Sequence, residues 1–369
     1  MKGKRALVRV DFNVPMKANK ILDTRRIEAS FETIKTLQKK GMKVILVAHL
    51  GDKKASLRTV AIYLSKHFPV KFLTTKILET NTIINLIDEL PSETVILLEN
   101  IRQYPREEKN DPKFSKILAT LGDIFVNDAF SVSHREHASV VGVTEYLPSY
   151  AGIQLEKEIK TLSKLLDNKK HPFLFILGGA KFSTKIPLIN RFIDSADQLI
   201  ITGAILNSFY KTAGFEVGVS VVEKGYEKEI KSLLSSPKIL LPIDVLVLRG
   251  PSSKKLLVNE VSRRDKIVDI GPQSSALIAE KIKKSKVVVW NGPTGWYEGG
   301  FTLATKILAK AMVDSKAFSV IGGGDTGAVV DKVLKNNKQE TKHIFISTGG
   351  GATLEYLATG TLPGVKCLK

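Results

Sequence analysis

Short apolar runs rich in β-branched residues alternate with longer amphipathic segments along the whole chain. This alternation is typical of βαβ units, in which helices cover the faces of a parallel sheet, so it predicts an α/β fold. Strands are expected at 6–10, 44–48, 95–98, 124–126, 173–177, 198–201, 287–290, 318–321 and 344–346, and helices at 26–39, 56–67 and 302–312.

The length of 369 residues exceeds that of one ordinary domain and favours two domains. Proline and glycine interrupt the pattern at 147–152, and the apolar residues of the segment that follows, 155–166, fall at helical spacing along one face. We therefore expect a first domain at 1–150, a connecting helix at 151–167 and a second domain from 168 onward.

Composition narrows the classes of function. The single cysteine, Cys367, excludes a disulfide framework and a paired-thiol site. The chain contains no uncharged apolar run of about 18 residues, so we expect a cytoplasmic protein without a membrane partner. The formal charge of +19 comes from dispersed lysines, densest at 281–286, without interleaved aromatic residues, so no specific nucleic-acid partner is expected.

Polar and basic residues follow the expected strands of the first half, where ligands of parallel sheets bind. They are Arg9, Asp11 and Asn13 after the first strand, His49 after the second, Arg102 after the third, and Asn127, Asp128, His134 and Arg135 after the fourth. A single arginine there is most simply a surface ion pair, but several at one sheet edge predict a site for a small, multiply charged anion. His134 and His137 lack a third ligand at useful spacing, which favours structural roles over metal binding.

Glycine-rich loops follow the expected strands of the second half, at 178–181, 291–295, 322–326 and 347–351. Glycine lets backbone N–H groups approach a ligand closely, and a helix that starts just afterwards adds its positive end, so these loops predict phosphate binding. Lys181 and Lys185 lie one helical turn apart at the start of an expected helix, within reach of one phosphate chain.

Two common nucleotide-binding motifs distinguish the possible kinds of nucleotide site. The chain lacks the G-x-x-x-x-G-K-[ST] motif of P-loop enzymes. Gly322, Gly324 and Gly327 match the dinucleotide fingerprint G-x-G-x-x-G, but Asp325 would place a carboxylate beside the pyrophosphate. A carboxylate in this turn suits Mg²⁺ bound to nucleotide phosphates better, although a nicotinamide-dependent dehydrogenase stays as a distant alternative. An anion site in one domain and a Mg-nucleotide site in the other predict phosphoryl transfer.

Ordered motifs from Lys4 to about Leu368 resemble phosphoglycerate kinase: Arg-Val-Asp-Phe-Asn-Val-Pro at 9–15, Glu-Asn-Ile-Arg at 99–102, Val-Asn-Asp-Ala-Phe at 126–130, His-Arg-Glu-His at 134–137, Leu-Gly-Gly-Ala-Lys at 177–181, Trp-Asn-Gly-Pro at 290–293, Gly-Gly-Gly-Asp-Thr at 322–326 and Ser-Thr-Gly-Gly-Gly-Ala at 347–352. The resemblance implies a monomer with two Rossmann-like domains, parallel sheets flanked by helices, facing across a cleft. The implied activity is reversible transfer between ATP and 3-phosphoglycerate, giving ADP and 1,3-bisphosphoglycerate.

The resemblance also implies roles for individual residues. Phosphoglycerate would be bound by Asp11, Asn13, Arg26, His49, Arg102 and Arg135. Arg26 and Lys181 would act on the transferring group. The nucleotide would contact Gly179, Ala180, Lys181, Lys185, Gly203, Asn291, Pro293, Glu298, Gly322, Gly323, Gly324, Asp325, Thr326, Gly349 and Gly350. Asp325 would hold Mg²⁺ and Glu298 the ribose. The helix at 151–167 would be a hinge, and a tail at 357–369, after a second domain at 168–356, would return to the first domain.

The chain departs from the family pattern around its binding residues. Asp52 stands where the family has a phosphate-binding arginine, Ser131, Val132 and Ser133 replace Gly-Thr-Ala, Thr184 replaces an aspartate, and 202–204 reads Thr-Gly-Ala for three glycines. Because Arg26, Lys181, Lys185 and Asp325 are retained, we expect an active enzyme with weakened binding. The alternative is a nucleotide-binding relative with impaired turnover and a binding or regulatory role.

Overall fold

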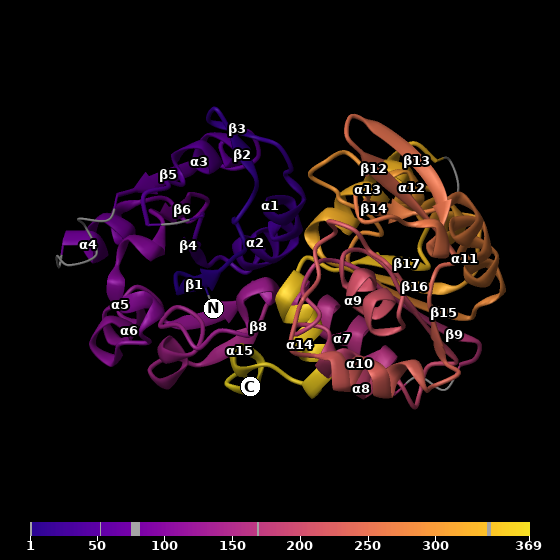
Figure 1. Ribbon diagram of the computed structural model, residues 1–369. Helices are drawn as coiled ribbons and strands as arrows, with labels where there is room; N and C mark the ends of the chain where they lie inside the picture. The colour runs from indigo at the N-terminus through magenta and orange to yellow at the C-terminus, as the bar shows by residue number, and fades with distance from the viewer. Residues whose placement is uncertain (1, 52, 75–81, 168–169, 338–340) are drawn as a thin grey trace. The chain divides into compact units, whose positions relative to one another are not determined.

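The computed structural model describes residues 2–51, 53–74, 82–167, 170–337 and 341–369 (Figure 1). The chain divides into two compact units: Met1–Ser163 together with Thr359–Lys369, called here the N-terminal unit, and Lys164–Ala358, called the C-terminal unit. In the described ranges, no helix is both long enough and apolar enough to cross a membrane.

The N-terminal unit is built on a parallel sheet with strand order β5-β6-β4-β1-β7-β8. The strands are β1 (Arg5–Arg9), β4 (Lys43–Val47), β5 (Val70–Leu73), β6 (Val95–Leu98), β7 (Ile124–Asn127) and β8 (Ser149–Ala151), and a small hairpin pairs β2 (Met16–Lys17) with β3 (Lys20–Ile21). Its helices are α1 (Arg25–Ala29), α2 (Phe31–Lys39), α3 (Arg58–Leu64), α4 (Thr82–Glu89), α5 (Pro105–Glu108), α6 (Pro112–Ala119) and α15 (Pro363–Lys366).

Helices cover both faces of this sheet because successive strand residues point to opposite sides. Ala6 and Val8 of β1 pack in a core cluster with residues of α2 and α3. Leu7 between them packs in a second cluster with residues of α4 and α6. The unbroken apolar runs seen in the sequence are therefore strands buried on both faces.

The C-terminal unit contains a second parallel sheet, with order β11-β10-β9-β15-β16-β17. The strands are β9 (Phe173–Leu177), β10 (Gln198–Ile201), β11 (Ile239–Leu240), β15 (Val287–Asn291), β16 (Phe318–Gly322) and β17 (Ile344–Ile346). A separate antiparallel sheet joins β12 (Asp244–Arg249), β13 (Ser252–Leu257) and β14 (Lys266–Ile270) (Figure 1). The helices are α8 (Ile186–Phe192), α9 (Ile205–Thr212), α10 (Glu227–Leu234), α11 (Pro272–Lys284), α12 (Leu303–Val313), α13 (Gly324–Lys335) and α14 (Gly350–Thr359).

The expected strands are all present, each within about one residue of its expected bounds, and the two parallel sheets confirm the predicted α/β class. Two helix predictions are wrong in detail. The helix expected at 26–39 breaks at Ser30 into α1 and α2. The helix expected at 56–67 begins only at Arg58, because the Glu99 carboxylate accepts hydrogen bonds from Ser56 Oγ and Leu57 N at 2.7 and 2.8 Å and holds that segment outside the helix.

Helix α7 (Ile153–Leu166) runs from the N-terminal unit into the C-terminal one. Its first turn is capped by side chains of the N-terminal unit: Asp128 Oδ1 accepts from Gln154 N at 2.9 Å, and Thr33 Oγ1 accepts from Ile153 N at 3.0 Å. A carboxylate at this end also interacts favourably with the helix dipole. The start of α7 is therefore firmly attached to the N-terminal unit.

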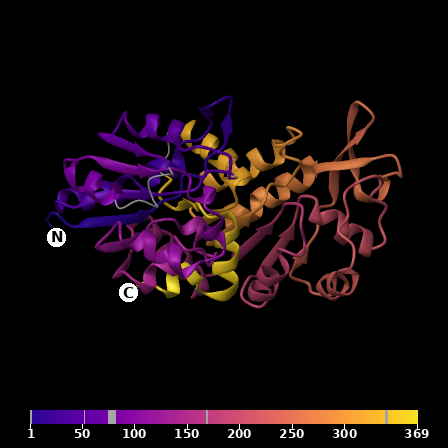
Figure 2. The same ribbon diagram turned by 90° about the vertical axis from the view of Figure 1, so that its left-hand side faces the viewer.

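The last residues of the chain pack on the N-terminal unit. Gly364 N donates to Ser133 O at 2.8 Å, Gly364 O accepts from Asn127 Nδ2 at 2.9 Å, and Lys369 N donates to Ser149 O at 3.0 Å. Figures 1 and 2 show this yellow segment, with α15, beside the magenta part of the N-terminal unit that contains β8. The C-terminal tail thus completes the unit in which the chain begins.

Candidate functional site

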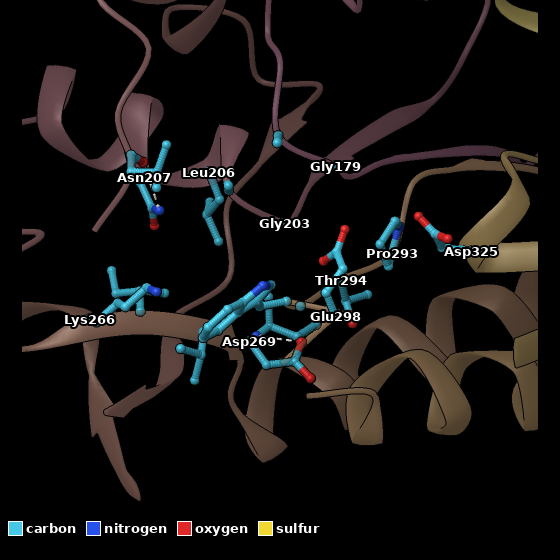
Figure 3. A pocket seen from close by; sticks show the side chains of 18 residues that line it. Gly179, Gly203, Leu206, Asn207, Lys266, Asp269, Pro293, Thr294, Glu298 and Asp325 are labelled. Carbon is cyan, nitrogen blue, oxygen red and sulfur yellow. Dashed lines mark hydrogen bonds between the residues drawn. The ribbon is translucent and has the colours of Figure 1, made fainter. Parts of the chain in front are cut away.

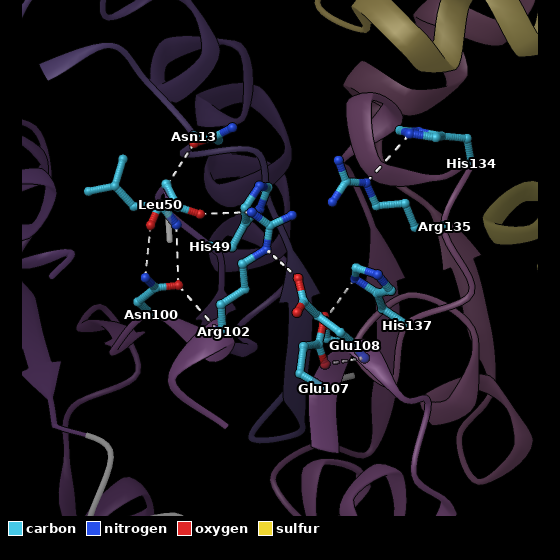
Figure 4. A network of polar contacts seen from close by, with 12 residues as sticks. Asn13, His49, Leu50, Asn100, Arg102, Glu107, Glu108, His134, Arg135 and His137 are labelled. Atoms are coloured by element: carbon cyan, nitrogen blue, oxygen red, sulfur yellow. Dashed lines mark hydrogen bonds and ion pairs between the residues drawn. The ribbon is translucent and has the colours of Figure 1, made fainter. Parts of the chain in front are cut away.

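The carboxyl ends of β1, β4 and β6 place polar and cationic side chains at one edge of the N-terminal sheet (Figure 4). Asp11 and Asn13 follow β1, and His49 follows β4. Arg102 lies in a short 3-10 helix (Ile101–Gln103) just after β6. Because β4 lies between β1 and β6, residues from three distant parts of the sequence meet here.

Arg26 of α1 joins the residues that follow β1. Its Nη1 donates to Asn13 O at 3.1 Å and forms an ion pair with Asp11 Oδ2 at 3.2 Å. Asn13 Oδ1 accepts from Gly51 N at 2.9 Å, and Arg102 Nη1 donates to Gly51 O at 2.7 Å. The loop at Gly51 therefore connects the two arginines through backbone and amide groups.

The charges of Arg26, Arg102 and Arg135, like that of Arg9, act on His49, and these first three arginines are called the cation cluster below. Burial, together with the neighbouring arginines, lowers the pKa of His49 far below its usual range and keeps the imidazole neutral. Burial and Arg135 also lower the pKa of Arg102, although Glu108 forms an ion pair with it at 3.4 Å. Cations gathered in this way repel one another, and a multiply charged anion would relieve that repulsion.

Two neighbours of this edge act as structural groups. Ser133 Oγ is buried, donates to Ala129 O at 3.0 Å and accepts from Asn127 Nδ2 at 3.0 Å. His137 Nδ1 lies 3.8 Å from Glu107 Oε1, and burial lowers the pKa of His137 to about 4. Among the residues that the structure describes, no group of three or more His, Cys, Asp or Glu side chains is placed to hold a metal. Asp52, the departure expected to weaken binding, lies outside the described residues.

In the C-terminal unit, three loops pack backbone against backbone. Gly178 N donates to Asn291 O at 2.7 Å, and Gly203 N donates to Thr294 O at 3.0 Å. Gly203 and Gly292 have φ of +65° and +89°, and a Cβ atom on Gly203 would lie 2.4 Å from Gly179 N. The glycines are needed because these three strand-end loops come closer than side chains allow.

The loops after β16 and β17 lead directly into helices. Gly323, with φ of +100°, precedes α13, and the backbone of Gly350 at the start of α14 lies near Gly323. Thr326 in the first turn of α13 is fully buried, and its Oγ1 has no hydrogen-bond partner within the described part of the chain. Two helix N-termini and an unsatisfied hydroxyl form a seat suited to phosphate oxygens.

Lys181 and Lys185 lie in different environments. The expected helix begins only at Ile186, so the helical spacing assigned to the two lysines is wrong; Lys185 and Ile186 both donate backbone N–H groups to Phe182 O in a turn. Lys181 is exposed. Lys185 is buried against the Gly179 backbone, its Nζ donates to Asn291 Oδ1, and burial lowers its pKa to about 8.

A pocket of about 450 Å³ extends from these loops (Figure 3). Gly179, Ala180, Gly203, Pro293, Glu298 and Asp325 line it, whereas Lys181, Lys185, Asn291, Thr326 and the loop at 349–350 lie outside its lining. The opposite wall, which was not expected from the sequence, comes from α9, β14 and the segment after β15 and includes Asn207, Lys266, Asp269 and Trp296.

The polar groups of that wall are well defined. Asn207 Nδ2 donates to Val221 O at 3.0 Å, while Asn207 Oδ1 is buried without a partner in the described ranges. Lys266 Nζ lies 3.8 Å from the centroid of the Trp296 ring, a cation–π contact. The presence of Trp296 so soon after Gly292-Pro293 was the one sequence signal that could have marked this wall, since an aromatic residue beside a phosphate loop suits a ribose or base.

Asp325 and Glu298 form the acidic end of the pocket. The pKa of Asp325 is raised by partial burial and by the charge of Glu298. Two carboxylates that repel each other beside a phosphate seat fit a divalent cation, and Mg²⁺ is commonly held by one or two carboxylates together with substrate phosphates. The residues present therefore fit the expected metal.

Comparison with known proteins gives consistent matches. A family model described as phosphoglycerate kinase matches residues 1–360. The chain is 42% identical over 386 residues to the phosphoglycerate kinase of Finegoldia magna, covering 100% of this chain and 97% of that protein. It is also 42% identical over 388 residues to that of Dictyoglomus turgidum, covering 100% and 96%.

Two solved structures resemble the whole chain. The phosphoglycerate kinase of Coxiella burnetii superposes with a TM-score of 0.81 at 34% identity, covering 99% of this chain and 96% of that one. The phosphoglycerate kinase of Pyrococcus horikoshii has a TM-score of 0.86 at 29% identity, covering 100% and 96%.

Proposed function

Because the chain belongs to the phosphoglycerate kinase family, we propose that its two units divide the substrates, phosphoglycerate in the N-terminal unit and Mg-nucleotide in the C-terminal unit. The chain is a glycolytic kinase that transfers a phosphoryl group reversibly between ATP and the carboxylate of 3-phosphoglycerate. The other pair of reactants is ADP and 1,3-bisphosphoglycerate.

The cation cluster is the observation that most strongly supports the phosphoglycerate site. A substrate with a phosphate and a carboxylate matches Arg26, Arg102 and Arg135, whose guanidinium groups bind both anions well. Neutral His49 and Asn13 donate hydrogen bonds without adding charge, and Asp11 orients Arg26 through their ion pair at 3.2 Å. These six residues form our proposed phosphoglycerate site.

The pocket and its adjoining loops form our proposed nucleotide site. The phosphates lie against Gly179, Gly203, Thr326 and the loops at 322–324 and 349–350, with Asn291 and Pro293 behind them. The base and ribose extend toward Asn207 and Trp296, and Glu298 accepts from the ribose. Asp325 holds Mg²⁺, which neutralises charge on the phosphates when it is bound.

Phosphoryl transfer needs positioning and positive charge more than covalent chemistry. We assign Arg26 and Lys181 to the transferring group, where their cations stabilise the charge that spreads over its oxygens. Lys185 holds the nucleotide phosphates. We further propose that α7 is the hinge between the units and that the chain acts as a cytoplasmic monomer.

The lowered pKa of Lys185 makes a prediction about pH. Below pH 8 the lysine is a cation and attracts phosphate; above it, the free enzyme loses that charge. The KM for ATP should therefore rise by about fivefold between pH 8 and 9, and Lys185→Arg should abolish the rise because arginine stays charged. Steady-state kinetics from about pH 6.5 to about pH 9 measures both, and the KM for 3-phosphoglycerate serves as internal control. An equal rise in both KM values would contradict the assignment.

Turnover tests the proposed function as a whole. The purified chain should form ADP from ATP only when 3-phosphoglycerate and Mg²⁺ are both present, and Asp325→Asn should raise the Mg²⁺ concentration required. If Asp325→Asn leaves the required Mg²⁺ concentration unchanged, Asp325 is not the metal ligand, although the family activity still stands.

A further inference from the structure

Arg9 is the most deeply buried cation at the substrate edge of the N-terminal sheet, with 1% of its surface exposed. Each side of its guanidinium group has a partner. Nε donates to Ser139 Oγ at 2.9 Å, Nη1 donates to Val10 O at 2.6 Å, and Nη2 lies 3.2 Å from His49 Nδ1. Unlike the cation cluster, this arginine is committed to the protein and does not face a ligand.

The contact with His49 fixes the chemistry of the imidazole. A guanidinium group only donates hydrogen bonds, so Nδ1 of His49 must accept with its lone pair. In a neutral imidazole the hydrogen then resides on Nε2. Protonation of Nδ1 would point two donors at each other, and His49 is neutral in any case because burial and the nearby arginines lower its pKa.

A second pair of buried side chains holds Arg9 in this orientation. Ser139 Oγ donates its single hydrogen to Glu107 Oε1 at 2.6 Å, and Ser139 N donates to Glu107 Oε2 at 3.0 Å. The lone pairs of Ser139 Oγ are thereby directed to Arg9 Nε. Glu107 is fully buried, and the positive charge of Arg9 counteracts the cost of burying its carboxylate.

We propose that Arg9 is a positioning residue that holds His49 as the Nε2–H tautomer, so that this histidine presents a hydrogen-bond donor to the anionic substrate. The proposal rests on the proposed role of His49 as a phosphoglycerate ligand. Without Arg9 the imidazole is free to place its hydrogen on Nδ1, and Nε2 would then direct a lone pair at the anion and repel it. Glu107 and Ser139 act one step further away, by orienting Arg9.

The tautomer can be measured directly by ¹⁵N NMR of the full chain labelled at histidine. The wild-type spectrum should show His49 as Nε2–H in the free enzyme at neutral pH. The charge-balanced variant Arg9→Gln/Glu107→Gln should show a mixture of tautomers and a KM for 3-phosphoglycerate raised about tenfold, with kcat and the KM for ATP little changed. Arg9→Lys, which keeps a donor toward Nδ1, should restore most of the affinity.

Arg5→Gln is the matched control, because Arg5 lies on the same strand but pairs with Asp88 and Asp123 at the other end. Arg5→Gln should change neither the tautomer of His49 nor the KM for 3-phosphoglycerate. If the double variant does not fold, Ser139→Ala provides the same tautomer readout with a smaller change. A wild-type His49 with hydrogen on Nδ1, or a tautomer unaffected in the folded Arg9 and Ser139 variants, would overturn the proposal.

The role of His49 itself is tested separately with His49→Ala. An unchanged KM for 3-phosphoglycerate in that variant would remove His49 from the proposed substrate site, whatever the tautomer. A raised KM in His49→Ala combined with an unaltered tautomer in the Arg9 variants would reject the positioning role of Arg9 alone. The two failures are therefore distinguishable.

Discussion

Replacing Arg26 with alanine is expected to lower kcat by about a hundred- to a thousandfold, the range seen when one donor to transition-state charge is removed. Arg26 is partly exposed, with 27% of its side chain accessible, and it is oriented by Asp11 and by Asn13 O. A cation oriented in advance stabilises charge that develops only during transfer, so its loss affects kcat more than KM. Steady-state kinetics at saturating substrates measures the change.

Arg25 provides the control for this experiment. It neighbours Arg26 on α1, and its guanidinium group is engaged in a close ion pair with Asp23. Arg25→Ala should leave kcat within about twofold of wild type, because the partly exposed ion pair of Arg25 with Asp23 lies outside the proposed substrate site. Equal losses in the two variants would indicate damage to α1 instead of a role for Arg26 in transfer, and an unchanged kcat in Arg26→Ala would remove its catalytic assignment.

Replacing Gly203 with alanine is the second change expected to have a large effect. The new Cβ would lie 2.4 Å from Gly179 N and 2.8 Å from Gly179 O, and the backbone at φ +65° disfavours any side chain. The two loops must then separate, which displaces the proposed phosphate seat. We expect the Kd for Mg-ADP to rise at least about tenfold and the stability to fall by about 1–3 kcal/mol, measured by calorimetric titration and thermal unfolding.

Gly225→Ala is the control that separates the clash between loops from the strain of a positive φ. It has φ of +91°, in the same conformational region, yet a Cβ atom there would meet nothing within 4 Å. Gly225→Ala should therefore lose about 1 kcal/mol of stability and keep its affinity for Mg-ADP. A similar loss of affinity in both variants would show that backbone strain, and not the contact between loops, explains the effect.

The sequence predicted the parallel sheets well because their strands are buried on both faces. Runs such as 95–98 and 173–177 have no polar residue to interrupt them, and they become β6 and β9 with unchanged bounds. The strand ends could then be located, and with them the arginines of one unit and the glycine loops of the other. Ligand positions follow from strand ends in this class of fold.

The wall formed by the antiparallel sheet could not be predicted in the same way. β13 is largely exposed and reads Ser-Ser-Lys-Lys-Leu-Leu, without the alternation or the apolar run that marks a strand. β14 contributes Lys266 and Asp269 to the pocket, but nothing in the sequence indicates which sheet it joins or which wall it forms. These residues become visible only once the chain is folded.

Contacts between side chains of neighbouring strands could not be predicted from the sequence either. Arg9 and His49 are 40 residues apart and meet because β1 and β4 are neighbours, whereas strand order cannot be read from sequence order. The late start of α3 depends on the tertiary hydrogen bonds from Ser56 and Leu57 to Glu99. Local propensity carries no information about such partners.

The division of substrates between the two units is tested most directly by titrating 3-phosphoglycerate and Mg-ADP, separately, into the chain, Arg102→Gln and Asp325→Asn. Arg102→Gln should weaken the binding of 3-phosphoglycerate about tenfold and leave the affinity for Mg-ADP unchanged, since a hydrogen bond to a charged group contributes about 1.5–3 kcal/mol. Asp325→Asn should weaken the binding of Mg-ADP and leave the affinity for 3-phosphoglycerate unchanged. The proposed division would be contradicted if either substitution weakened the binding of both ligands equally, or weakened only the binding of the ligand assigned to the other unit.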